Sequence, residues 1–100
     1  MTLRVRPEAR ADLLEAASWY EDREPGLGQA LVGEVDDVIA RIQAGPHHYR
    51  IAYRIARRAL VRRFPFAVYF IETDASIIVI AVVHQRRALN ILDARLDEPE

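Results

Sequence analysis

The sequence predicts an α+β fold in which two helices precede an antiparallel sheet. The periodicity of its apolar residues supports this prediction. Between residues 7 and 42 they recur every three or four positions, as on one face of a helix. Between residues 49 and 83 they alternate or run continuously, as in strands. One hundred residues is the size of one domain, so we expect a single domain over residues 1–100.

The helical part divides in two at Pro25-Gly26, a strong turn signal. The first helix is predicted from Pro7, which suits the first helical position, to Glu24. The second runs from Gly28 and ends before Gly45-Pro46. Because few residues join them, the two helices should pack as an antiparallel hairpin.

Extended segments lie on both sides of this hairpin. Residues 3–6 alternate and predict a short strand. Further strands are predicted at residues 49–56, 59–64, 67–73 and 77–83, the last apolar at every position, as in a strand covered on both faces. Residues 74–76 form the turn before it, and a short helix is expected from Leu89.

Composition excludes several classes of function. The chain has no cysteine, which rules out disulfides and thiolate metal sites. Its longest apolar run, residues 77–83, is too short to span a membrane, and no apolar signal region follows Met1. No phosphate-binding or serine-nucleophile motif occurs, and the adjacent His47 and His48 lack a third ligand. We therefore expect a cytoplasmic protein without cofactor, metal or membrane contact.

The net charge of −1 conceals a strong asymmetry. Residues 8–37 contain nine acids and two arginines, whereas residues 38–71 contain seven arginines and no acid. The planar guanidinium of arginine matches phosphate and carboxylate groups. The basic segment therefore predicts an anionic partner.

A hairpin centred near residue 75 predicts a register in which paired residue numbers sum to about 150. Within a residue or two, this places His84 near Phe66, Arg86 near Phe64, and Arg87 near Arg63. One end of the sheet should then gather five basic side chains: Arg62, Arg63, His84, Arg86 and Arg87. Like charges opposed across strands are destabilising, so an anion bound there would explain the cluster. The alternative is a fan of solvated arginines.

His84 ends the fully apolar strand and has two interpretations. Its imidazole could act as a general acid or base near neutral pH. Alternatively, it is a structural histidine that hydrogen-bonds the backbone. The sequence leaves both open.

Three stretches, in this order, resemble the RelE/ParE toxin superfamily (plasmid-stabilisation type). They are residues 7–28, residues 57–70 and residues 78–87. The resemblance implies a β-α-α-β-β-β fold with an antiparallel sheet packed against the helical hairpin. It also implies the toxin of a type II toxin–antitoxin system, which inhibits growth and is neutralised by a cognate antitoxin. Either a homodimer or a heterotetramer with the antitoxin is compatible with it.

Members of the superfamily act in one of two ways. Some cut messenger RNA on the ribosome without a metal, and others bind and poison DNA gyrase. The nucleases commonly carry arginine in an aromatic-Arg-Leu-Val-Tyr strand, and this chain has Ala67 at that position. The nucleases also often carry a tyrosine or another working side chain near the C-terminus, whereas in this chain no aromatic residue follows Phe70. The pair His84-Gln85 is instead similar to the end of gyrase-directed members. The resemblance therefore favours binding of gyrase.

The two mechanisms assign different roles to the basic residues. In a metal-independent endoribonuclease, His84, Arg63 and Arg87 would be catalytic. In a binding inhibitor, five arginines would hold anionic groups of the target: Arg58, Arg62, Arg63, Arg86 and Arg87. An inert nucleic-acid-binding relative is a further alternative.

Overall fold

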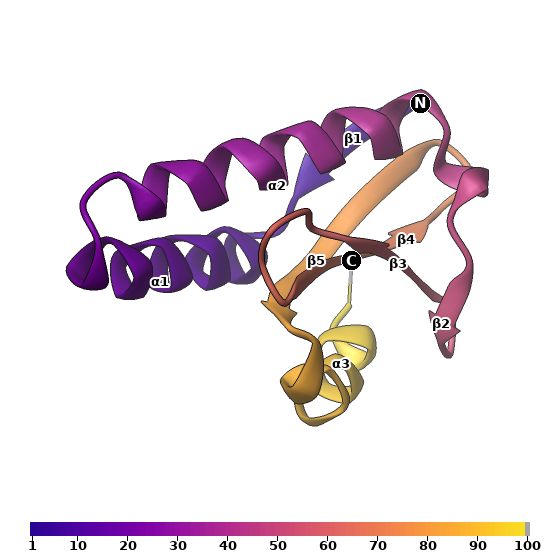
Figure 1. Cartoon of the computed structure of the whole chain (residues 1–100). Helices are drawn as coiled ribbons and strands as arrows, with labels where there is room; N and C mark the ends of the chain where they lie inside the picture. The colour runs from indigo at the N-terminus through magenta and orange to yellow at the C-terminus, as the bar shows by residue number, and fades with distance from the viewer. Residues whose placement is uncertain (100) are drawn as a thin grey trace.

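The computed structural model describes residues 1–99 and has the α+β architecture expected (Figure 1). Its elements are β1 Thr2–Val5, α1 Pro7–Arg23, α2 Leu27–Ala44, β2 Ile51–Tyr53, β3 Ala56–Leu60, β4 Phe66–Glu72, β5 Ser76–His84 and α3 Ala88–Asp97, with 3-10 turns η1 Pro46–His48 and η2 Gln85–Arg87. The five strands form one sheet in the order β1-β5-β4-β3-β2. The α1–α2 hairpin covers one face and α3 the other. None of the helices within residues 1–99 is both long and apolar enough to cross a membrane.

The helical hairpin forms where the sequence predicts it. An apolar stripe of α2 is buried against the sheet: Leu31, Val35, Val38 and Ile42. Gly26 supplies the left-handed conformation of the turn, with a φ of 91°. The Glu21 carboxylate accepts hydrogen bonds from the backbone N–H groups of Gly26 and Gly28, at 2.8 and 3.0 Å. These bonds satisfy donors at the start of α2 that have no partner within the helix.

The antiparallel pair β4–β5 forms the centre of the sheet. Its register runs from Phe66 opposite His84 to Glu72 opposite Ile77, which confirms the predicted pairing of His84 with Phe66. A bulge follows Tyr69, so that Ile80 is an extra residue on β5. As a result, Val79 and Val82 pack on the hairpin side, whereas Ile80 and Ala81 pack on the α3 side.

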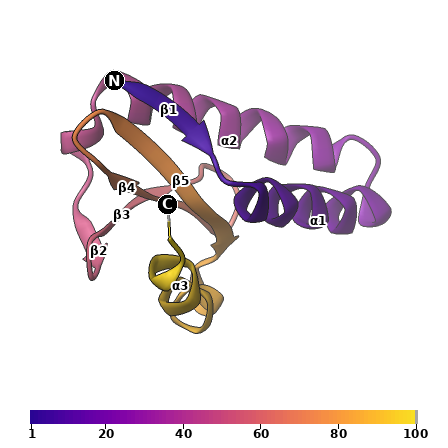
Figure 2. The same ribbon diagram turned by 180° about the vertical axis from the view of Figure 1, so that it is seen from behind.

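Two predictions about the sheet were wrong in detail. The sheet is not purely antiparallel, because β1 pairs in parallel with β5 (Figure 2). The hairpin delivers the chain to the opposite edge of the sheet, which leaves the outer edge of β5 for β1. The strands expected at residues 49–56 and 59–64 are in fact β2 and β3, joined by a turn in which Arg54 has a φ of 50°. The expected helix from Leu89 is confirmed as α3.

Candidate functional site

An open cavity of about 540 Å³ lies at the end of the sheet where β4 begins and β5 ends. Residues of α1 between Asp12 and Tyr20, the strand ends and the start of α3 line it. Its wall includes Glu15, Trp19, Tyr20, Phe66, His84 and Arg87. This end of the molecule therefore combines aromatic surface with charges of both signs.

Aromatic rings build one side of the cavity. The Tyr20 ring packs edge-to-face on Phe64 and Phe66, with centroids 5.0 and 6.1 Å apart. Phe66 in turn contacts the His84 ring at 5.7 Å, because the two residues pair across β4 and β5. Trp19 joins the cluster through Tyr20 and remains 51% exposed. Such rings offer a large apolar contact area to a partner.

His84 is held by the backbone that follows it. Its Nδ1 accepts a hydrogen bond from the N–H of Arg86, at 3.1 Å, and so caps η2. Because Nδ1 is the acceptor, the proton of the neutral imidazole lies on Nε2. The ring therefore presents a hydrogen-bond donor, and no lone pair, at its free nitrogen. The structure thus contains the backbone-bonded histidine that the sequence offered as one alternative.

The strand pairing at this end stops before it reaches the predicted arginines. Strand pairing stops at His84, where Gln85 donates to the carbonyl of Pro65 at 3.0 Å and the chain turns into η2. Strand pairing between β4 and β5 therefore does not extend to Arg86 and Arg87. The cavity receives Arg87 beside His84.

The other four arginines predicted to hold an anion do not line this cavity. Arg63 has a φ of 72°, and its guanidinium lies 3.9 Å from the Glu34 carboxylate on α2. Arg58 pairs with Tyr69, which belongs to the core on the α3 side, so Arg58 lies on the face opposite the hairpin. Arg62 and Arg86 are exposed. Of the five arginines predicted to hold an anion, Arg58, Arg63 and Arg87 thus have different surroundings.

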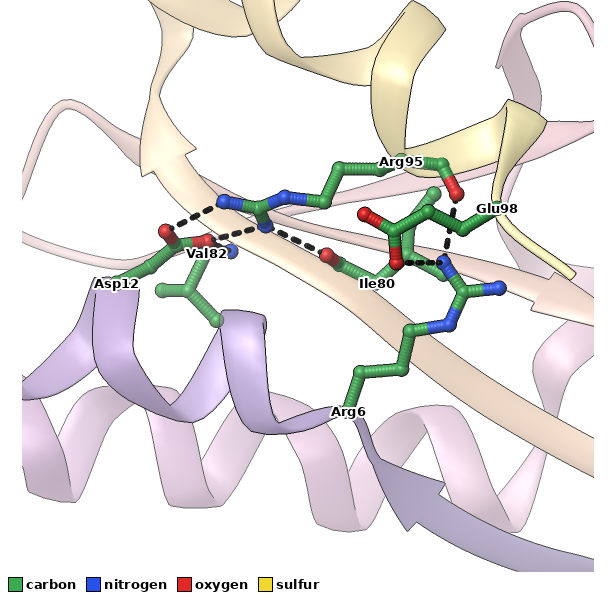
Figure 3. A network of polar contacts seen from close by, with 6 residues as sticks. All are labelled: Arg6, Asp12, Ile80, Val82, Arg95 and Glu98. Atoms are coloured by element: carbon green, nitrogen blue, oxygen red, sulfur yellow. Dashed lines mark hydrogen bonds and ion pairs between the residues drawn. The ribbon is translucent and has the colours of Figure 1, made fainter. Parts of the chain in front are cut away.

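The structure contains a polar network beside the cavity that the sequence did not predict (Figure 3). The Arg95 guanidinium forms a bidentate ion pair with Asp12, at 2.8 and 2.9 Å, which raises the pKa of Arg95. Arg95 also donates to the carbonyl of Ile80 at 2.7 Å, and Asp12 accepts from the N–H of Val82 at 3.0 Å. The buried Arg6 donates to the Arg95 carbonyl at 2.6 Å. No local pattern signals a pair that is 83 residues apart.

Other arginines of the basic segment also have internal partners. Arg57 lies 3.0 Å from Glu72, which also contacts His47 at 3.0 Å. Arg54 contacts both Asp93 and Asp97 of α3. Within residues 1–99, no group of three or more histidine and acidic side chains is arranged to hold a metal ion.

Comparison with known proteins gives the family. The family model described as "ParE toxin of type II toxin-antitoxin system, parDE" matches residues 3–89. The chain belongs to the ParE toxin family. The ParE resemblance noted in the sequence is thereby confirmed.

Relatives and solved structures agree with this assignment. The chain is 32% identical over 95 residues to Toxin ParE2 of Mycobacterium tuberculosis (strain CDC 1551 / Oshkosh). The aligned region covers 94% of this chain and 90% of that relative. The same figures hold for Toxin ParE2 of the strain ATCC 25618 / H37Rv. A solved chain of the chromosomal ParDE TA system from P. aeruginosa superposes with a TM-score of 0.76, over 84% of this chain and 95% of that one, at 18% identity. That likeness shows the ParE fold.

Proposed function

We propose that this ParE-family chain is a toxin that inhibits growth by binding DNA gyrase, and that a cognate ParD-type antitoxin neutralises it. Family membership supports the role of toxin. The hydrogen bond from the Arg86 N–H to His84 Nδ1 is the observation that best supports binding over RNA cleavage.

Metal-free RNA cleavage requires a base for the 2′-hydroxyl, an acid for the leaving oxygen and cations around the phosphate. With its Nδ1 engaged, His84 offers an Nε2–H, which suits the acid of such a reaction and not the base. Arg63 lies toward Glu34, and Ala67 stands where nucleases of the superfamily commonly carry arginine. Among the described residues, Arg87 is the one cation that accompanies His84 in the cavity wall. These groups are better suited to contact than to catalysis.

The same end of the molecule suits a protein partner. Trp19, Phe66 and Ile91 offer apolar surface within the cavity, and Arg87 offers a charge for an acidic side chain at its rim. An antitoxin segment with apolar anchors and acids would complement both features. The P. aeruginosa relative comes from a ParDE system, which is the source of the ParD-type expectation.

Two purified assays distinguish the targets. We expect the protein to inhibit supercoiling by gyrase and to leave messenger RNA intact on ribosomes. Expression alone should arrest growth, and co-expression of a neighbouring antitoxin should relieve the arrest. Normal growth at a verified high level of folded protein would instead favour the inert relative.

Point variants test the roles of the basic residues. Arg87→Glu should weaken toxicity strongly, because Arg87 lines the cavity, whereas His84→Ala should weaken it modestly. Arg63→Glu serves as the comparison, since Arg63 lies toward Glu34. Ribosome-dependent cleavage by the wild type that disappears in a well-folded His84→Ala would overturn the binding proposal. General acid–base groups contribute about 10²- to 10⁴-fold in rate, so the two outcomes are easily separated.

A further inference from the structure

The charged residues that line the cavity come from different elements. Glu15 belongs to α1, whereas Arg87 belongs to η2, the turn that leads into α3. His84, at the end of β5, adds a hydrogen-bond donor, because its Nδ1 is engaged by the Arg86 N–H. The cavity therefore offers a negative charge on α1, and a positive charge with a donor at the end of β5 and in η2.

Glu15 has no ion pair within residues 1–99. Asp12, the other acid of the cavity wall, is held by Arg95 at 2.8 and 2.9 Å (Figure 3). Side chains three or four positions apart are neighbours on a helix, and at these distances from Glu15 there is no cation: the residues are Ala11, Asp12, Ser18 and Trp19. Glu15 is thus the acid of this cavity whose charge the fold leaves without a partner.

The exposed Trp19 ring lies one helical turn beyond Glu15 on α1. The central carbon of the Arg23 guanidinium lies 3.4 Å from the centre of this ring, and Arg23 also donates to the Trp19 carbonyl at 2.9 Å. The nearest following cation of α1 is therefore engaged with Trp19 and does not neutralise Glu15. A cation from a partner would meet a carboxylate and an aromatic ring on the same face of α1, and both attract positive charge.

We propose that Glu15 receives a basic side chain, lysine or arginine, of the antitoxin segment that enters this cavity, while Arg87 receives an acidic one. This inference rests on the proposed antitoxin and names the charges that its segment must carry. The two charges also fix the direction of the segment, because the reverse direction would bring like charges together at both residues. Glu15 is therefore a specificity-determining residue.

Glu15→Lys and Asp36→Lys change the net charge by the same amount. Asp36 is exposed in the middle of α2, does not line the cavity and has no ion pair within residues 1–99. An antitoxin attracted only by the arginines should bind both variants at least as tightly as it binds the wild type. One that places a basic side chain against Glu15 should bind Glu15→Lys more weakly. The probe is the purified antitoxin encoded beside the toxin, with Kd measured by calorimetry at low and high salt and folding checked by circular dichroism.

Glu15→Lys should weaken binding at least about ten-fold, whereas Asp36→Lys should leave it unchanged or tighten it. The loss should shrink at high salt. Among antitoxin variants in which one lysine or arginine at a time is replaced by glutamate, one should restore binding to Glu15→Lys. Equal binding by the two toxin variants, or a loss that no antitoxin variant restores, would overturn the inference and leave the proposed antitoxin standing. Absence of binding by the wild type would overturn both.

Discussion

The substitutions Gly28→Ala and Gly33→Ala place the same methyl group in two different environments of α2. A Cβ atom at Gly28 would lie closer than 3.0 Å to the carbonyl oxygen of Ala17, a separation that Cβ atoms essentially never show. A Cβ atom at Gly33 would have nothing within 4 Å. The first position therefore sets how closely α1 approaches α2, and the second does not.

The expected effects have opposite signs. Alanine is about 1 kcal/mol more favourable than glycine inside a helix, so Gly33→Ala should raise the free energy of unfolding by about 0.5–1 kcal/mol. At Gly28 the added methyl meets backbone, which cannot rotate away, and the helices must separate by about half an ångström or more. Overpacking of this kind costs about 1–3 kcal/mol, which exceeds the gain in helix propensity. Gly28→Ala should therefore be destabilising.

Urea and thermal unfolding of both variants measure these effects. For a domain of this size, about 1 kcal/mol shifts the melting temperature by roughly 4–8 °C. Gly33→Ala should melt above the wild type and Gly28→Ala below it. A Gly28→Ala variant as stable as Gly33→Ala would refute the inference that close packing of the hairpin requires glycine. Because α1 supplies Trp19 and Tyr20 to the cavity, Gly28→Ala should also reduce toxicity more than Gly33→Ala does.

Three further predictions concern single interactions. His84→Asn keeps an acceptor for the Arg86 N–H, so its urea unfolding should stay close to that of the wild type. His84→Ala removes the acceptor and should lower the free energy of unfolding by about 0.5–2 kcal/mol. Equal losses of stability in the two variants would argue against the capping role. Association with the purified antitoxin, followed by stopped flow, should slow as salt rises, because the exposed arginines attract an acidic partner; a rate independent of salt would contradict this. The hydrogen bond to Asp93 raises the pKa of Tyr53, so Asp93→Ala should lower the pH at which Tyr53 ionises in an ultraviolet absorbance titration. The stability from that bond is present below the ordinary pKa of tyrosine and is lost as the pH rises through the raised value; unchanged titration in Asp93→Ala would contradict the assigned contact.

The sequence predicted best those elements whose ends are marked by proline or glycine. Pro7, Pro25-Gly26 and Gly45-Pro46 bound the two helices, and the structure places their ends within a few residues of these signals. The turn between β2 and β3 escaped prediction because arginine and isoleucine occupy it in place of glycine, asparagine or proline. Arg54 and Arg63 adopt positive φ, which no rule of turn composition assigns to arginine.

The sequence predicted only the part of the candidate site that follows from the strand register between β4 and β5. The turn after β4 placed His84 opposite Phe66, since pairing in a hairpin follows from its centre. The point at which pairing ends follows from the backbone contact of Gln85 with Pro65, and the direction of Arg63 depends on an acid elsewhere in the chain, Glu34. The Asp12–Arg95 pair joins two helices that meet only in the folded protein.

The arginines of the basic segment, residues 38–71, divide into those with carboxylate partners inside the fold and those without. Of its seven arginines, Arg54, Arg57 and Arg63 contact carboxylates within the fold. The other four have no ion pair within residues 1–99: Arg41, Arg50, Arg58 and Arg62.

The placement of the remaining cations restricts what kind of partner could neutralise them. Arg58 lies on the α3 side of the sheet, whereas Arg87 lines the cavity between α1 and α3. A single phosphate is too small to contact cations on separate surfaces, and an extended chain with spaced acids is not. The distribution therefore supports a wrapping protein partner over one bound anion. Charge reversal at an arginine outside the cavity, such as Arg58, should therefore weaken such an association and leave most of it intact, because the other charged contacts persist.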